Sequence, residues 1–183
     1  MVAQAELPRT ATGREGVASQ LYLTCVLAGS RYLVPASAVR EVEEVGAITP
    51  VPATPSWLRG VMNLRGMIVG VVDLAQFLGL AADQALSTEA LICAPRSDGR
   101  AGDDELMIAL AVEAVSNIRT LAADELLPLP DQPQADAIAA YLTGLYRAPA
   151  GAGRGEELLG VLDLEALLRV FVVDQLVAPV SHG

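Results

Sequence analysis

Apolar residues along this chain fall into short runs, separated by segments rich in glycine, proline and charge. The most ordered stretch covers residues 57–80. Within it, β-branched and long apolar side chains at 61–62 and 67–72 predict two strands. Asn63-Leu64-Arg65-Gly66 lies between them, and Asn first with Gly fourth favours a type I turn, so we expect a hairpin with Arg65 exposed at its tip. The run 67–72 lacks polar alternation, which predicts a strand covered on both faces.

A short helix is expected directly after this hairpin. Asp73 follows the second strand, and its carboxylate can cap a helix that begins at Leu74. Leu74, Phe77 and Leu78 share one helical face, and Gly79 is placed to end the helix. The stretch therefore predicts a strand–turn–strand–helix unit.

The other apolar runs predict a mainly β protein with short helices. Val39, Val42 and Val45 are spaced as either a helix or a strand would require, and spacing alone does not decide. We expect a turn at 36–38 and a strand over 39–45. Further predictions are a hairpin from strands at 20–27 and 31–35, strands at 89–94, 106–112 and 114–121, a short helix within 135–146, and a strand followed by a helix over 158–168.

Polar and proline-marked segments separate these elements. Residues 1–18 lack periodicity, so we expect a disordered N-terminal tail, with a C-terminal tail at 175–183. Prolines predict extended loops at 49–55 and 124–134, and polar composition predicts hairpin tips at 95–105 and 147–157.

An internal repeat runs through the chain. Residues 38–42 recur at 114–118, 57–61 recur at 141–145, and 70–78 recur at 160–168. The matches keep their order, which chance rarely produces, and repeats of this kind indicate a duplicated fold. We infer one domain over 19–174 with two similar all-β halves, about 19–85 and 86–174, either separate or intertwined. Each half is expected to close a small barrel around its own core, and the halves to meet across an apolar seam.

The repeat separates structural positions from distinctive ones. Asp73 and Asp163 occupy the same place in the two copies, so both are interpreted as helix caps and not as a catalytic pair. The turn 63–66 has no counterpart, because the second copy continues as Tyr146-Arg147 and then a glycine-rich segment. The Arg65 turn is therefore where we expect a binding site.

Composition limits the class of protein. The chain has 183 residues, is 52% hydrophobic and has a mean hydropathy of +0.43, so a sizeable core is expected. No run reaches the roughly 18 uninterrupted apolar residues of a membrane helix, and the N-terminus has no apolar signal core. We therefore expect a cytoplasmic protein. The net charge of −10 disfavours nucleic acid and anionic membranes as partners.

Candidate chemistry is sparse. The single histidine, His182, is the penultimate residue, where nothing can orient it, so a histidine-based triad is not expected. Phosphate-binding glycine motifs are absent from the sequence. The acidic run Asp103-Asp104-Glu105 is better explained as a solvated loop than as a metal site. Cys25 and Cys93 are expected to be small buried residues. We expect no enzyme activity, no cofactor and no metal.

At RGVMNLRGMIVGVVDL the sequence resembles the CheW-like family, the coupling proteins of bacterial chemosensory arrays. EAVSNI, YLTGL and GVLDLEALL support the likeness at the right intervals, and it extends from about residue 21 to 168. The resemblance implies two pseudo-symmetric five-stranded SH3-like barrels packed on each other. It also implies a non-catalytic adaptor of two-component signal transduction, which couples the cytoplasmic tip of a methyl-accepting chemoreceptor to the regulatory domain of a chemotaxis-type histidine kinase. Gly70 departs from the proline usual in the family.

The resemblance also implies partner-binding positions. Arg65 matches the arginine of the family's NLRG motif, whose turn is shaped by its neighbours. From the residues alone, an ordinary solvated arginine is equally plausible, and the three valines below fit core strand positions better than a surface. The positions implied are Val39, Glu41, Gly60, Asn63, Arg65, Gly66, Val112 and Val115.

Three functions stay open at this point. One is the receptor–kinase adaptor of flagellar chemotaxis. Another is the same adaptor in a pilus or gliding pathway. The third, of a different class, is a double β-barrel module that binds a small ligand between its halves. In the adaptor hypotheses, apolar surface would supply adhesion, and the Arg65 turn would supply orientation through charge-assisted hydrogen bonds.

Overall fold

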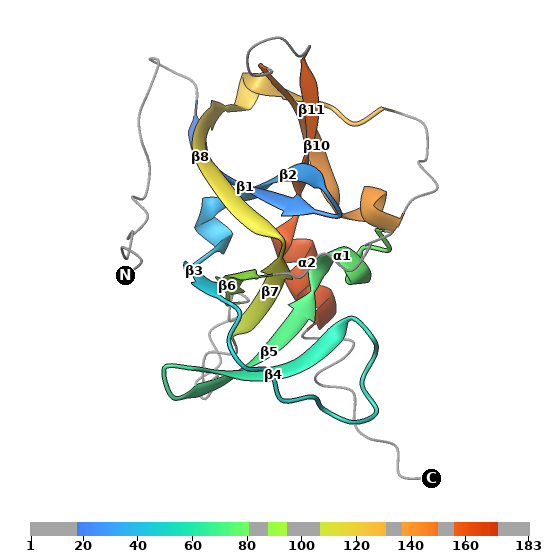
Figure 1. Cartoon of the computed structure of the whole chain (residues 1–183). Coiled ribbons are helices and arrows are strands. Elements are labelled where there is room, and N and C mark those ends of the chain that lie inside the picture. Colours follow the sequence, from blue (N-terminus) through green and yellow to red (C-terminus); the bar gives the residue numbers. More distant parts are fainter. Residues whose placement is uncertain (1–17, 81–87, 95–106, 131–136, 150–155, 172–183) are drawn as a thin grey trace.

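The computed structural model describes residues 18–80, 88–94, 107–130, 137–149 and 156–171. These residues form two sheets, one above the other in Figure 1, with short helices between them. The six-stranded sheet has the order β8 (Ala114–Ala122), β1 (Ser19–Leu27), β2 (Ser30–Pro35), β11 (Glu157–Leu162), β10 (Leu142–Ala148) and β9 (Leu126–Leu127). The five-stranded sheet has the order β3 (Glu41–Glu44), β6 (Glu89–Cys93), β7 (Ile108–Val112), β5 (Met67–Asp73) and β4 (Leu58–Leu64).

Each sheet combines strands from both sequence halves. The first half contributes β1 and β2 to the six-stranded sheet, and β6 and β7 of the second half lie between β3 and β5 in the other sheet. Two parallel pairs join the halves, β5 with β7 and β2 with β11. The expectation that each half closes a barrel around its own core is therefore wrong, and the halves are intertwined.

The repeat is visible in the topology. The order β3-β6-β7-β5-β4 has the same connections as β8-β1-β2-β11-β10. The register of both long hairpins shifts at the same repeat position, between Leu58 and Gly60 and between Leu142 and Gly144. The N–H of Asp73 donates to the Trp57 carbonyl at 2.7 Å, and in the second copy Asp163 donates to Tyr141 at 2.8 Å. The sequence repeat is thus a structural repeat.

Helix caps follow the sequence prediction. The Asp73 carboxylate accepts a hydrogen bond from the Gln76 N–H at 3.0 Å at the start of α1 (Leu74–Phe77). Asp163 accepts one from Ala166 at 2.9 Å at the start of α2 (Leu164–Val170). Gly79 follows α1 with a φ of +68°, a conformation that favours glycine. Both aspartates are therefore caps.

The hairpin of β4 and β5 forms as expected, but its turn type differs. Leu64 pairs with Met67, so the loop has two residues, Arg65 and Gly66, with φ of +51° and +92°. A type I turn has negative φ at both central positions, and two positive values correspond to a type I′ turn. The type I′ turn matches the right-handed twist of the flanking strands, which explains the difference.

Strand 67–72 is not covered on both faces as predicted. Met67 and Ile68 are 50% and 68% exposed, whereas Val69, Val71 and Val72 are buried. The first two residues extend past the core at the hairpin end, so a run of apolar residues continues into solvent there. The interpretation of an unbroken buried strand holds only from Val69 onward.

Other boundaries differ by a few residues. The turn at 36–38 is a 3-10 helix, η1 (Ala36–Ala38), and the strand expected over 39–45 is confined to β3. The loop expected at 124–134 contains part of η2 (Ala123–Glu125) and the short strand β9. The short helix within 135–146 is η3 (Ala137–Tyr141), followed by β10. Arg147, Ala148 and Glu157, expected in a hairpin tip, belong to strands. Residues 1–17 of the N-terminal tail, the C-terminal tail at 175–183, the tip at 95–105 and residues 150–155 of the second tip lie outside the described residues.

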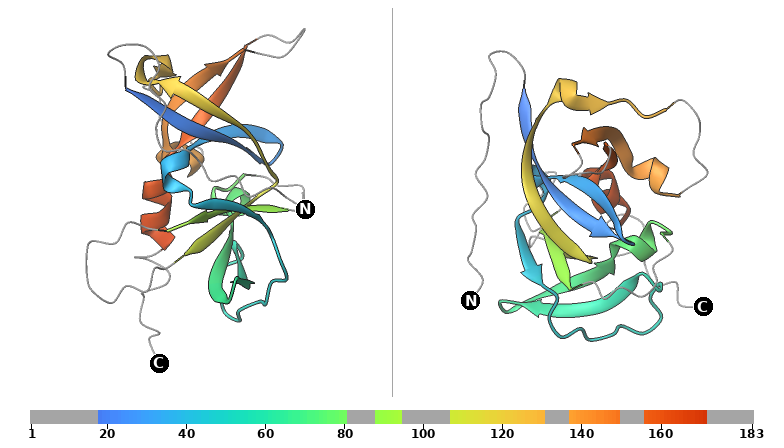
Figure 2. Two further views of the ribbon diagram at one scale, coloured as in Figure 1. Left: turned by 90° about the vertical axis from the view of Figure 1, so that its left-hand side faces the viewer. Right: turned by 45° about the horizontal axis from the view of Figure 1, so that its top comes forward.

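The largest core cluster lies between the two sheets. It joins Cys25 and Leu27 of β1, Cys93 of β6 and Val112 of β7 with the apolar faces of α1 and α2. Smaller clusters lie within each sheet. Figure 2 shows α1 and α2 in this central layer. Burial raises the pKa of both Cys25 and Cys93 to about 12, as expected of small buried thiols.

Four aromatic rings pack beside this central core. Trp57 meets Phe77 edge-on with ring centroids 5.3 Å apart, and Phe77 lies 4.6 Å from Phe171 and 5.6 Å from Tyr141. Trp57 and Tyr141 are equivalent in the repeat, so both copies contribute to one cluster. Trp57 is thus a core anchor, as predicted. No helix in the described part of the chain is long and apolar enough to cross a membrane.

Candidate docking site

The β4–β5 hairpin presents Arg65 to solvent at its tip. The side chain of Asn63 supports the turn, since its Oδ1 accepts a hydrogen bond from the Gly66 N–H at 2.8 Å. Gly66 has a φ that other residues adopt at a cost, and Arg65 itself adopts a left-handed conformation. The residues Asn63, Arg65 and Gly66, expected to belong together, form one compact turn.

The guanidinium of Arg65 is bound to two carboxylates of β3. Its Nη1 lies 2.9 Å from Glu41 Oε2, and its Nη2 pairs with Glu43 Oε1. The side chain of Arg65 is 54% exposed, and those of Glu41 and Glu43 are 33% and 30% exposed. Glu41 was expected near the binding surface, and the structure brings it into contact with Arg65. Two glutamates and one arginine leave the group with a formal charge of −1.

Gly60 supports the hairpin from the other end of β4. Its φ is +134°, and a Cβ built there would lie 2.2 Å from the Thr49 carbonyl oxygen. Thr49 and Val61 exchange both backbone hydrogen bonds, at 2.8 and 2.9 Å. Only glycine lets the chain before β4 approach this closely. Gly60 is buried and therefore positions the hairpin.

Exposed apolar residues adjoin the Arg65 turn. Met67 and Ile68 follow Gly66 directly, and Ile68 is the most exposed large apolar residue among those described. Val42 is also exposed, but it lies on the opposite face of β3 from Glu41 and Glu43 and does not belong to this surface. An exposed apolar surface next to a held arginine suits a protein partner better than a small polar ligand.

The three valines divide between core and edge. Val39 and Val112 are buried in the central cluster, so neither offers surface to a partner in this conformation. Val115 is half-buried at the start of β8, and its N–H donates to the Glu89 carboxylate. Val39 and Val112 are both core residues, but only Val112 lies in a strand, because Val39 follows η1 and precedes β3. Of the three valines, Val115 alone is partly exposed, and it lies on the edge strand β8.

Sequence reasoning missed two features of this site. Glu43 received no role, although Glu41 and Glu43 are two apart on a strand and so share a face. The alternation Glu41-Val42-Glu43 was the available signal. The exposure of Met67 and Ile68 had no such signal, because their apolar run continues into buried residues.

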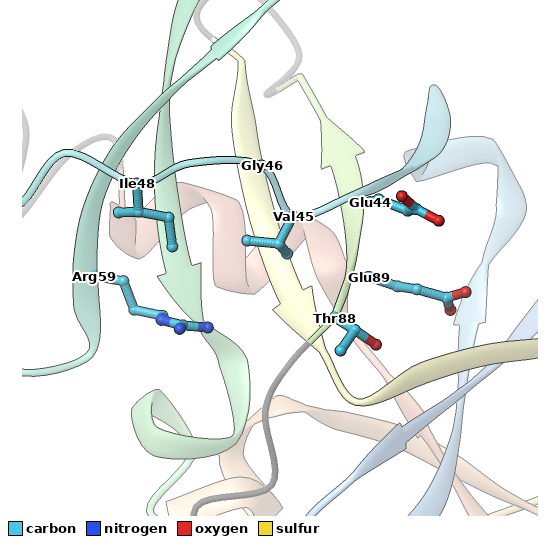
Figure 3. Close-up of a pocket in the computed structure, with 7 residues that line it drawn as sticks. All are labelled: Glu44, Val45, Gly46, Ile48, Arg59, Thr88 and Glu89. Carbon is cyan, nitrogen blue, oxygen red and sulfur yellow. The ribbon is translucent and has the colours of Figure 1, made fainter.

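A shallow pocket lies on another side of the five-stranded sheet. It has a volume of about 580 Å³ and is shown in Figure 3. In that view Arg59 and Ile48 lie on one side, Val45 lies in the middle, and Glu44, Thr88 and Glu89 lie on the other. The pocket is formed by the β3–β4 connection, β4 and the start of β6. The described residues contain no group of three or more metal-binding side chains.

The architecture defines a class: a mostly β scaffold of two intertwined sheets that share one repeated topology. The sequence model of the family described as "CheW-like domain" matches residues 21–172. The chain belongs to the CheW-like family. The resemblance seen in the motifs is confirmed, and so is the class of function, a coupling and scaffold protein of chemotaxis signal transduction.

Individual relatives agree with this assignment. Chemotaxis protein CheW of Klebsiella aerogenes is 29% identical over 150 residues, which cover 81% of each chain. Protein FrzA of Myxococcus xanthus is 31% identical over 137 residues, covering 74% of this chain and 77% of that protein. The crystal structure of the scaffolding protein TtCheW from Thermoanaerobacter tengcongensis has a TM-score of 0.65 at 21% identity, covering 86% of this chain and 93% of that one. That structural likeness supports the fold.

Proposed function

We propose that this protein is a non-catalytic, cytoplasmic adaptor that joins the tip of a chemoreceptor to the regulatory domain of a chemotaxis-type histidine kinase. Membership of the CheW-like family supports the adaptor role. The observation that carries the docking site is the Arg65 turn, held by Glu41 and Glu43 beside exposed Met67 and Ile68. The protein would reach receptor arrays at the membrane through its partners.

The intertwined fold suits a rigid bridge. The largest core cluster unites both sheets with α1 and α2, so surfaces on the two sheets keep a fixed relative orientation. Exposed aliphatic side chains supply adhesion, and the Arg65 corner supplies orientation. Each contact alone is small, and repetition in an array adds strength by avidity.

Arg65→Glu is the direct test of this site. The variant places a third carboxylate beside Glu41 and Glu43, and the repulsion should displace the hairpin tip without disturbing the buried core. We expect loss of binding to the kinase regulatory domain or to the receptor tip in a pull-down, with an unchanged circular dichroism spectrum.

Arg147→Glu is the matched control. Arg147 also lies near a hairpin end, is 57% exposed and pairs with a single glutamate, Glu156, at 3.1 Å, but in the other sheet. It should retain binding. A folded Arg65→Glu protein that binds both partners as well as the wild type would refute the docking site.

The same adaptor role in a pilus or gliding pathway is the alternative within this class. It differs only in the identity of receptor and kinase, which gene neighbours would reveal. A small-ligand module is the alternative of another class, and the pocket around Arg59 is the observation in its favour. That function predicts that a ligand raises the melting temperature of the protein with no kinase present. The variant Arg59→Ala should abolish this rise.

A further inference from the structure

The shallow pocket of the five-stranded sheet shares no lining residue with the Arg65 turn. Its lining comes from the end of β3 and the segment that follows, from β4, and from the start of β6. Glu44 belongs to this lining, and it points to the opposite face of β3 from Glu43, which binds Arg65. A ligand in the pocket therefore leaves the Arg65 ion pairs in place.

A β-bulge places Arg59 at this pocket. The register of β4 with β5 shifts between Leu58 and Gly60, so Arg59 is the extra residue of β4 and has no partner on β5. Figure 3 shows its side chain extending from β4 toward the side of the pocket that holds Thr88. Within the described part of the chain, no hydrogen bond or ion pair engages its guanidinium. Arg59 can therefore bind a carboxylate from outside the chain.

Two carboxylates lie at the other side of the pocket. Glu44 of β3 and Glu89 of β6 are direct partners in the antiparallel register. Like charges at directly opposed positions destabilise a pair of strands. One oxygen of Glu89 accepts the Val115 N–H, whereas Glu44 has no hydrogen bond or ion pair with any residue that the structure describes. A cation beside these two carboxylates would relieve their repulsion.

Apolar side chains separate the two charged sides. Val45 and Ile48 line the pocket and also pack against the core cluster inside the sheet. The volume of about 580 Å³ lies within the range of ligand sites, roughly 300–1,000 Å³. Small-molecule sites bury most of their ligand, which a shallow pocket does not do. An extended peptide requires no such enclosure, because only its side chains enter, so the shape favours a peptide.

The charges of this pocket occur in one copy of the repeat. Thr143 is the extra residue of the matching bulge, at the place of Arg59. Thr120 stands at the strand position of Glu44, where it faces Leu21 and no second carboxylate. The same backbone is therefore built without either charge in the second copy. A ligand explains the charges of the first copy better than a structural requirement does.

We propose that this pocket is a docking site for an extended peptide segment of a protein partner, in which an acidic and a basic side chain flank apolar residues. The acidic side chain pairs with Arg59, and the basic one lies beside Glu44 and Glu89. The apolar residues between them cover Val45 and Ile48. The site goes beyond the adaptor function proposed above and does not depend on it.

Two short peptides test the site directly. The acetylated and amidated peptides Gly-Glu-Val-Val-Lys-Gly and Gly-Lys-Val-Val-Glu-Gly present the two charges in the two possible directions, without charged ends. Each is titrated into the isotope-labelled full chain and followed by amide NMR. With one of the two orders, we expect saturable shift changes at residues 44–48, 59 and 88–89, and none at 63–66. Replacing both charged residues of that peptide by glutamine should weaken binding roughly tenfold.

Arg59→Thr and Glu44→Thr identify which side chain recognises which charge. Each variant introduces the residue that the second copy carries at that place, so the fold should be retained, as circular dichroism would show. Arg59→Thr should weaken the charged peptide roughly fivefold, but leave unchanged the affinity of a peptide whose glutamate is already glutamine. Glu44→Thr should behave in the same way toward the lysine. Each variant should keep its full preference for the charge that it does not contact.

Arg147→Thr and Glu156→Thr are the matched controls, because each removes one charge from an exposed ion pair of the other sheet. Both should bind the peptide as the wild type does. The docking site is overturned if neither peptide order gives saturable shifts at the pocket, or if the two threonine variants weaken charged and uncharged peptides alike. Free lysine binding as tightly as the peptide would also overturn it, since the pocket would then be a small-molecule site. None of these results affects the adaptor function, which Arg65→Glu tests.

Discussion

Gly60 shows how a single residue sets the geometry of the candidate site. Its missing side chain lets the Thr49 carbonyl lie where a Cβ would be, and its φ of +134° is one that other residues rarely adopt. Gly144 stands at the same place in the repeat, but its Cβ would meet the Leu127 carbonyl at 3.1 Å and its φ carries no such strain. Equivalent glycines therefore have unequal importance.

Gly60→Ala is expected to destabilise the protein by more than about 2 kcal/mol, because strain at a positive φ adds to a backbone overlap. Gly144→Ala, the matched change, should cost about 1 kcal/mol or less, since a shift of a few tenths of an ångström relieves the contact. Urea unfolding of the two variants measures the difference. Equal losses in the two variants would show that the Thr49–Val61 bridge is not specially tight.

At the scale of elements, local patterns predicted most strands and both caps. The hairpin, the cap residues Asp73 and Asp163, and the 3-10 turn at 36–38 depend on neighbouring residues, so sequence spacing reveals them. The turn type was missed because strand twist, a property of the paired strands, decides between type I and type I′. The ion pairs of Arg65 with Glu41 and Glu43 were missed because they join β3 to a hairpin tip more than twenty residues away in the sequence.

The caps are predicted to be purely structural. Asp73→Ala and Asp163→Ala should each lower the free energy of unfolding by about 1 kcal/mol, because each removes the side-chain acceptor for a first-turn N–H. Asn at either position should retain most of the stability. In all four variants the affinity for the kinase regulatory domain, measured by isothermal titration calorimetry, should stay at the wild-type value. A cap variant that folds but loses binding would show that these positions also serve docking.

At the scale of the whole molecule, the duplicated fold was predictable and its intertwining was not. The order of the repeats indicated two similar halves, and the topology bears out the similarity. The exchange of β1–β2 and β6–β7 between sheets depends on parallel pairs that join distant segments, β2 with β11 and β5 with β7. Short apolar runs carry no information about which distant strand they pair with, so the sequence could not correct the expectation of a separate core in each half.

Intertwining predicts that the sequence halves cannot fold alone. A fragment of residues 19–85 retains β3, β4 and β5 but lacks β6 and β7, which lie between β3 and β5. The fragment 86–174 likewise lacks β1 and β2, which lie between β8 and β11. Each fragment would expose its share of the central cluster around Cys25 and Cys93. We expect little chemical-shift dispersion from either fragment alone, and native dispersion when the two are mixed and refolded together.

The same argument predicts one cooperative unfolding transition for the full chain, because the cluster between the sheets belongs to both of them. Calorimetry should give a van't Hoff enthalpy equal to the calorimetric enthalpy, and circular dichroism and Trp57 fluorescence should report coincident midpoints. Trp57 is the single tryptophan and packs against Phe77 and Phe171 beside the shared core, so it reports on that core. A folded 19–85 fragment, or two separated transitions, would mean that each sheet is stable without strands from the other half. The rigid bridge between docked partners would then have to come from another source than the shared core.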